Sequence, residues 1–95
     1  MKRKYKAIHE LNKKLDELGI SHKMHNAFDG WQIYVPKTSM TGFEGDAVQH
    51  QFSYGNEEDL IEVWGFGLDE PVGYLTADEA LKYFVEWHER KQHGK

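Results

Sequence analysis

The chain has 95 residues, a formal net charge of −4 and no cysteine. Its length predicts one domain spanning 1–95, and the absence of thiols excludes disulfides and thiolate zinc sites. No apolar run reaches the ~20 residues that cross a bilayer, and the basic start lacks the apolar core of a secretion signal, so we expect a cytoplasmic protein without a membrane partner.

The charges are unevenly distributed along the chain. Residues 38–81 contain ten Asp or Glu and no Lys or Arg. Such an acidic block would repel phosphates, so nucleic acid is not an expected partner. The block predicts either a solvated set of loops and strand edges or a negative surface that attracts a basic partner or a cation.

The first predicted element is a helix over residues 5–18. Ile8, Leu11 and Leu15 recur at helical spacing and form its apolar face. Gly19 follows the last apolar residue of the segment, as is typical of a helix C-terminus.

Residues 20–35 predict a β-hairpin. The turn is expected at Asp29-Gly30, because Asp-Gly between two alternating stretches favours a tight turn. That turn would pair Phe28 with Trp31. We expect one face of the hairpin to pack beneath the helices, and its apolar residues are Ile20, Met24, Phe28, Trp31, Ile33 and Val35.

The second half of the chain predicts a loop, two strands and a helix. Residues 36–46 read as a long loop, whereas 47–54 and 60–66 read as strands. The 60–66 strand is apolar on both faces, so either both of its sides are covered or it exposes an apolar patch. Thr76 and Glu79 predict a capping box at the start of the last helix.

Together these elements predict an α+β fold. Its sheet is antiparallel and four-stranded, and it is flanked in sequence by an N-terminal and a C-terminal helix. Both helices are expected to pack on one face of the sheet.

The favoured function is non-enzymatic protein binding through the acidic block and the loop around Met40 and Phe43, with Trp64 or Phe66 adding apolar area if the 60–66 strand is uncovered. Aromatic anchors surrounded by charge are typical of an interface. A strand edge could instead pair with a copy of the chain and give a homodimer. The candidate interface residues are Met40, Phe43, Glu44, Asp46, Trp64 and Phe66.

The alternative function is the binding of a small ligand or a metal. The predicted register turns His22, Asn26 and His50 toward the apolar face, where polar side chains need partners. They are either satisfied structural residues or the lining of a pocket. His22 and His25 cannot share an ion on a strand, because residues three apart point to opposite faces.

No segment matches a known catalytic or phosphate-binding pattern. The hydroxyl residues lack a nucleophile elbow or a triad context, and the acids fit no calcium loop. The Gly-x-x-Gly of TGFEGD lacks the lysine and the strand-to-helix context of a phosphate cradle. The sequence therefore favours a non-enzyme, and we assign no catalytic residue, no cofactor and no metal ligand.

Four motifs, FDGWQIYVP, DAVQHQFSYG, LIEVWGF and VGYLTADEAL, resemble small uncharacterised proteins of phages and prophages of Firmicutes. The resemblance implies an intracellular accessory protein and transfers no catalytic residue. The order of elements also resembles the double-stranded-RNA-binding domain and the HicA-type toxin. The last helix begins TADEALK, with acids where the first family has bases, and Gly30 is followed by WQIY without the histidine of the second, so neither activity carries over.

Overall fold

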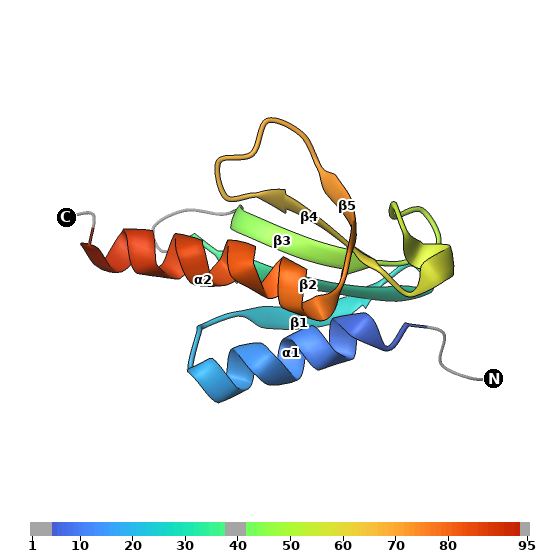
Figure 1. Ribbon diagram of the computed structural model, residues 1–95, viewed down its shortest axis with the longest axis horizontal. Helices are drawn as coiled ribbons and strands as arrows, with labels where there is room; N and C mark the ends of the chain where they lie inside the picture. Colours follow the sequence, from blue (N-terminus) through green and yellow to red (C-terminus); the bar gives the residue numbers. More distant parts are fainter. Residues whose placement is uncertain (1–4, 38–41, 94–95) are drawn as a thin grey trace.

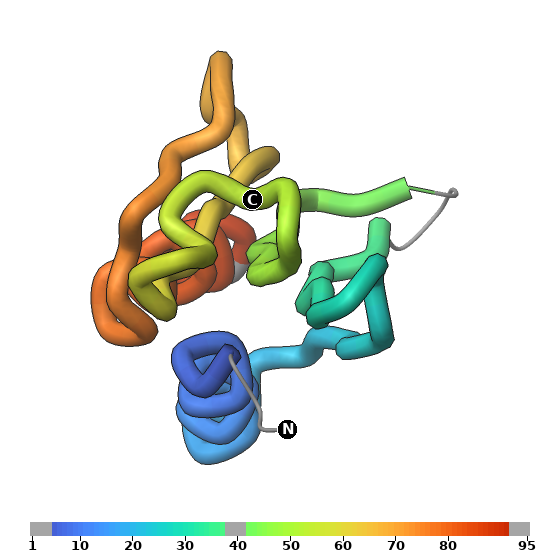
Figure 2. The backbone as a smooth tube through the Cα atoms, turned by 90° about the vertical axis from the view of Figure 1, so that its right-hand side faces the viewer, coloured from blue at the N-terminus to red at the C-terminus, as the bar shows by residue number. Residues whose placement is uncertain are grey.

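The computed structural model describes residues 5–37 and 42–93. These residues form an α+β fold with a five-stranded antiparallel sheet and an α-helix at each end of the sequence (Figure 1). The strands lie across the sheet in chain order, and both helices are on the same side of it (Figure 2). The elements are α1 (Ala7–Leu18), β1 (Lys23–Ala27), β2 (Gly30–Pro36), β3 (Phe43–Gln49), η1 (Asn56–Glu58), β4 (Ile61–Gly65), β5 (Val72–Leu75) and α2 (Ala77–His93).

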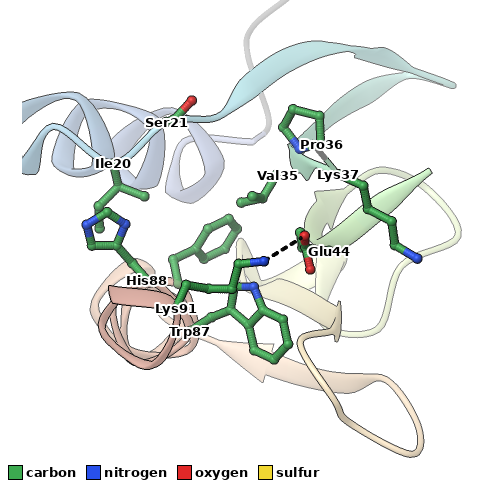
Figure 3. A pocket seen from close by; sticks show the side chains of 10 residues that line it. Ile20, Ser21, Val35, Pro36, Lys37, Glu44, Trp87, His88 and Lys91 are labelled. Carbon is green, nitrogen blue, oxygen red and sulfur yellow. Dashed lines mark hydrogen bonds and ion pairs between the residues drawn. The ribbon is translucent and has the colours of Figure 1, made fainter. Parts of the chain in front are cut away.

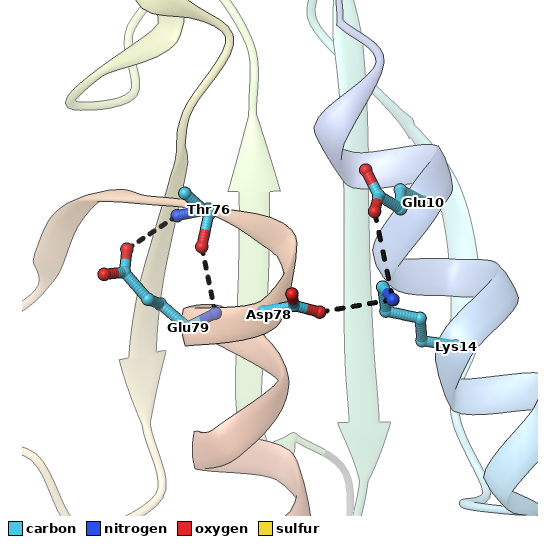
Figure 4. A network of polar contacts seen from close by, with 5 residues as sticks. All are labelled: Glu10, Lys14, Thr76, Asp78 and Glu79. Carbon is cyan, nitrogen blue, oxygen red and sulfur yellow. Dashed lines mark hydrogen bonds and ion pairs between the residues drawn. The ribbon is translucent and has the colours of Figure 1, made fainter.

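The two helices end and begin where the sequence predicted. Gly19 follows α1 in the left-handed conformation, with φ 71°, and its N–H donates to the Asp16 carbonyl. At the start of α2 the capping box forms: Thr76 N donates to Glu79 Oε1 over 2.9 Å, and Glu79 N donates to Thr76 Oγ1 over 3.1 Å (Figure 4). Local signals therefore define one end of each helix.

The hairpin forms between β1 and β2, but its predicted turn is wrong by one residue. Ala27 pairs with Gly30, so Phe28 and Asp29 make the turn, and Asn26 rather than Phe28 lies opposite Trp31. The pairing differs from the predicted one by two positions, which keeps the residues that remain paired on their predicted faces. Phe28 is the exception, because it was expected to pack beneath the helices. Phe28 leaves the strand and its side chain is 72% exposed.

Close packing of the strands explains why Gly30 is not part of the turn. A Cβ at Gly30 would lie 1.9 Å from the backbone oxygen of Gln49 on β3. Only glycine fits at this approach of two backbones. Gly30 therefore belongs to β2, and Phe28 takes the positive φ of 56° that the turn requires.

The remaining strands differ from the prediction at their ends. β3 begins at Phe43, so residues 43–46 are strand and not loop, and residues 50–54 are turns rather than a continuation of the strand. β5 is a short fifth strand that the sequence did not predict. β4 lies between β3 and β5, with Val63 buried on one side and Trp64 exposed on the other.

The core lies between the helices and one face of the sheet. α1 packs against β2 and β3, and α2 packs against β4, β5 and α1. Met24, Trp31 and Val35 of the hairpin pack against this core, as predicted. An ion pair of 3.2 Å between Lys14 and Asp78 also links the two helices (Figure 4). The largest fully buried apolar side chains are Phe84, Ile8, Leu11, Leu15, Ile33, Ile61 and Val63.

Candidate functional site

The face of the sheet turned away from both helices is the first candidate site. Side chains alternate between the two faces of a strand, and Ile33, Ala47 and Val63 point into the core. Their neighbours therefore point to the opposite side, which we call the open face. The open face carries Gln32 and Tyr34 from β2, Asp46 and Val48 from β3, and Glu62 and Trp64 from β4.

Strand pairing arranges three of these residues in a row across the sheet. Tyr34 lies opposite Asp46, and Asp46 lies opposite Trp64. Trp64 is 52% exposed. The Tyr34 ring lies against Phe43, with 4.4 Å between the ring centroids, and Phe43 is itself 44% exposed. A carboxylate thus lies between aromatic side chains that remain partly in solvent.

A short hydrogen-bonded chain holds the carboxylate of Asp46 in place. Gln32 Nε2 donates to Asp46 Oδ2 over 2.6 Å, and Gln32 Oε1 is 2.5 Å from His25 Nε2. Because Gln32 presents its oxygen to the imidazole, His25 Nε2 is the donor. The chain runs from β1 to β3 across the open face and orients one carboxylate oxygen.

Partial burial raises the pKa of Asp46 above its ordinary value. Desolvation is the largest cause, the hydrogen bond from Gln32 lowers the pKa, and the nearby charge of Glu62 raises it. The ionised carboxylate is therefore held in surroundings that disfavour its charge. A cation brought to this position would relieve that cost.

Other predicted interface residues lie elsewhere. Glu44 turns toward α2, where its carboxylate pairs with Lys91 Nζ at 3.2 Å (Figure 3). Phe66 is buried in the core, with its ring 4.8 Å from that of Phe84, and so offers no exposed contact. Met40 lies outside the described residues. Of the six predicted residues, Phe43, Asp46 and Trp64 gather at the open face.

The predicted pocket of His22, Asn26 and His50 does not form. The His22 ring bonds to the Ile20 carbonyl at 2.7 Å and to Asn12 Oδ1 at 2.8 Å, just after α1. The His50 ring accepts from Phe52 N at 3.1 Å in the turn that follows β3. The two histidines belong to separate local networks, and Asn26 is exposed on β1.

The described residues also contain no metal-binding cluster. Residues 5–37 and 42–93 bring together no group of three His, Asp or Glu side chains that could hold an ion.

Tyr34, Gln32 and Glu62 were not among the predicted site residues. The alternation of the hairpin sequence puts Gln32 and Tyr34 on the face opposite its apolar residues, and nothing in that pattern marks either residue as functional.

Comparisons with protein-family models, curated proteins and solved structures gave no match for this chain. Among the described residues, neither helix is long and apolar enough to cross a membrane.

Proposed function

We propose that this chain is a non-enzymatic binding module whose open face holds a basic segment of a partner protein. The observation that carries the proposal is the row of Tyr34, Asp46 and Trp64, in which a half-buried carboxylate lies between the partly exposed Tyr34 ring and the exposed Trp64 ring. Exposed aromatic side chains of this kind are enriched in protein interfaces.

A Lys or Arg side chain fits this row by two interactions. Its positive charge can pair with Asp46, where partial desolvation strengthens the attraction. Its cationic group can also lie over the Trp64 or Tyr34 ring, which contributes ~0.5–2 kcal/mol depending on exposure. Glu62 adds a second acid next to the row, and its Oε1 already accepts from Tyr54 N at 2.8 Å.

The proposal also includes a cellular role for the chain. The lack of cysteine and the resemblance to phage and prophage proteins favour an accessory role in the cytoplasm. In that role the chain would act by occupying a partner and not by chemistry. The same surface disfavours nucleic acid, because Asp46 and Glu62 would repel phosphates.

A selection from peptides of random sequence tests the proposal. The immobilised full chain is used to select binders from a yeast-displayed library of such peptides. We expect the selected peptides to be enriched in Arg and Lys. Trp64→Ser should weaken their binding at least tenfold, the effect of losing an interface anchor.

Leu18→Ser is the matched control, because Leu18 is an equally exposed apolar side chain at the end of α1, 57% against 52% for Trp64. It should leave peptide binding unchanged. Selected peptides without basic residues, or equal losses from both variants, would contradict the proposal. Light scattering at two protein concentrations would reveal a homodimer. If that dimer buried the open face, the occupant of the face would be a second copy of this chain and not a partner protein.

A further inference from the structure

A cleft on the helix side of the sheet is separate from the open face. It has a volume of 520 Å³ and lies between the second half of α2, the segment after α1, and the facing ends of β2 and β3 (Figure 3). Ligand pockets are typically ~300–1,000 Å³. Ile20, Val35 and Phe84 supply its apolar wall.

One buried donor in the cleft has no partner. The indole Nε1 of Trp87 is buried and makes no hydrogen bond to the described residues. Figure 3 places this nitrogen on the ring edge turned toward Lys91 and Glu44. A buried N–H without an acceptor costs free energy, and an acceptor from a ligand would remove that cost.

The charged groups around the indole nitrogen favour an anionic acceptor. Lys37 and Lys91 line the cleft with Glu44, and the Lys91 ammonium is 3.2 Å from the Glu44 carboxylate. The Glu44 carboxylate is mostly shielded from solvent, since the Glu44 side chain is only 15% exposed. Lys37 also lines the cleft, but Figure 3 shows its ammonium turned away from the indole, so Lys91 is the cation that an anionic acceptor would meet beside Trp87.

We propose that this cleft binds a small apolar monocarboxylic acid. The carboxylate would accept from Trp87 Nε1–H and pair with Lys91, while the apolar tail would lie against Ile20, Val35 and Phe84. The inference is independent of the open face, because the two sites use different residues and lie on opposite sides of the sheet. A failure of one proposal therefore leaves the other standing.

Octanoate is a suitable probe, with 1-octanol and octylammonium as matched neutral and cationic molecules of the same tail length. The chain has three tryptophans, so a ¹⁵N-labelled sample gives three indole N–H signals by NMR. Trp87→Phe identifies the signal of interest by its loss. Octanoate should shift that signal downfield and saturably, and octanol more weakly, whereas octylammonium should leave it unchanged.

Two substitutions in the cleft should act in opposite directions. Lys91→Gln should weaken octanoate binding at least fivefold, because it removes the cation and leaves Glu44 to repel the carboxylate. Glu44→Gln should strengthen binding at least twofold, because it removes that repulsion and frees Lys91. Lys13→Gln, which changes the same charge on an exposed part of α1, should have no effect.

The proposal is wrong if octanoate leaves the Trp87 signal unmoved, or if octylammonium moves it equally. It is also wrong if Glu44→Gln weakens binding as much as Lys91→Gln, since both residues would then be structural. Because Glu44→Gln is predicted to gain affinity, a loss of fold cannot imitate the expected result.

Discussion

The buried amide of Gln49 donates from Nε2 to Asp59 Oδ1 over 2.7 Å, and together these two residues cap the start of α1. Gln49 Oε1 accepts from Ile8 N at 2.9 Å, and Asp59 Oδ1 accepts from Lys6 N at 2.8 Å and Ala7 N at 3.1 Å. The Lys6 side chain makes no capping hydrogen bond of its own. The N–H groups of Lys6, Ala7 and Ile8 at the start of the helix thus find acceptors on residues that are distant in the sequence.

Asp59→Ala should lower the free energy of unfolding by about 2 kcal/mol, because it removes a helix cap and leaves Gln49 Nε2 without its acceptor. Asp59→Asn should cost less, since it keeps one oxygen and asparagine tolerates the left-handed φ of 59° found here. Urea denaturation measures both. Asp69→Ala, at an exposed loop position, should change stability little, and an equal loss there would refute the capping role.

Gly30→Ala should destabilise the fold by about 3 kcal/mol or more, because the new Cβ would overlap the Gln49 backbone oxygen and neither strand can move without breaking the ladder. Gly67→Ala is the control: Gly67 has a positive φ of 83°, which Gly30 does not share, but its Cβ would meet nothing closer than 4.0 Å. That control should cost only about 1 kcal/mol. Thermal unfolding that showed similar losses for the two variants would remove the steric explanation for the shifted turn.

Tyr5 should make stability depend on pH in the alkaline range. Its hydroxyl donates to Asp29 Oδ2 at 2.8 Å, and burial together with this bond and the Asp29 charge raises the pKa of Tyr5 from 10.0 to about 12. The fold therefore favours the protonated phenol. The protonated Tyr5 hydroxyl therefore contributes its full stabilisation of the fold below pH 10.0, and this stabilisation is lost as the pH rises toward 12.

The measurement for Tyr5 is the difference in unfolding free energy between wild type and Tyr5→Phe. Below pH 10.0 the variant should be less stable by about 1 kcal/mol, the usual value of one hydrogen bond. Above that pH the difference should shrink. Tyr74→Phe, at an exposed tyrosine, should show no such trend, and a difference that stayed constant up to pH 12 would contradict the raised pKa.

Asp46→Asn should raise stability at neutral pH by about 0.5 kcal/mol, the scale of one partly exposed substitution. The raised pKa means that the fold disfavours the ionised carboxylate. Ionised Asp46 therefore lowers the stability of the fold at neutral pH, and this effect disappears below pH 3.8, the ordinary pKa of the group. The gain should vanish in acid for the same reason. Thermal unfolding at the two pH values tests this, and a variant that is less stable at neutral pH would contradict it.

Features set by neighbouring residues could be predicted from the sequence. Gly19 and the Thr76–Glu79 pair define helix ends through contacts within a few positions. The two faces of the hairpin were also predictable, because the alternation of side chains survives a two-residue change of register. Trp31 and Met24 lie on the same face for this reason.

Features set by distant contacts could not be predicted. Residues 36–46 were predicted to form a loop, but Gly45 lies in β3, where a Cβ would be 2.5 Å from the Phe66 ring. The capping role of Asp59 depends on residues more than fifty positions away. At the candidate site, strand pairing brings Tyr34 next to Asp46, and neither residue carries that information alone.

The central claim is that the open face binds a basic segment, and NMR mapping with a selected Arg- or Lys-rich peptide tests it most directly. Titrating the peptide into the ¹⁵N-labelled full chain should shift the signals of Gln32, Tyr34, Asp46 and Trp64 saturably, and leave those of α1 and α2 in place. Shifts concentrated on the helices, or on the exposed edge of β1, would contradict the claim.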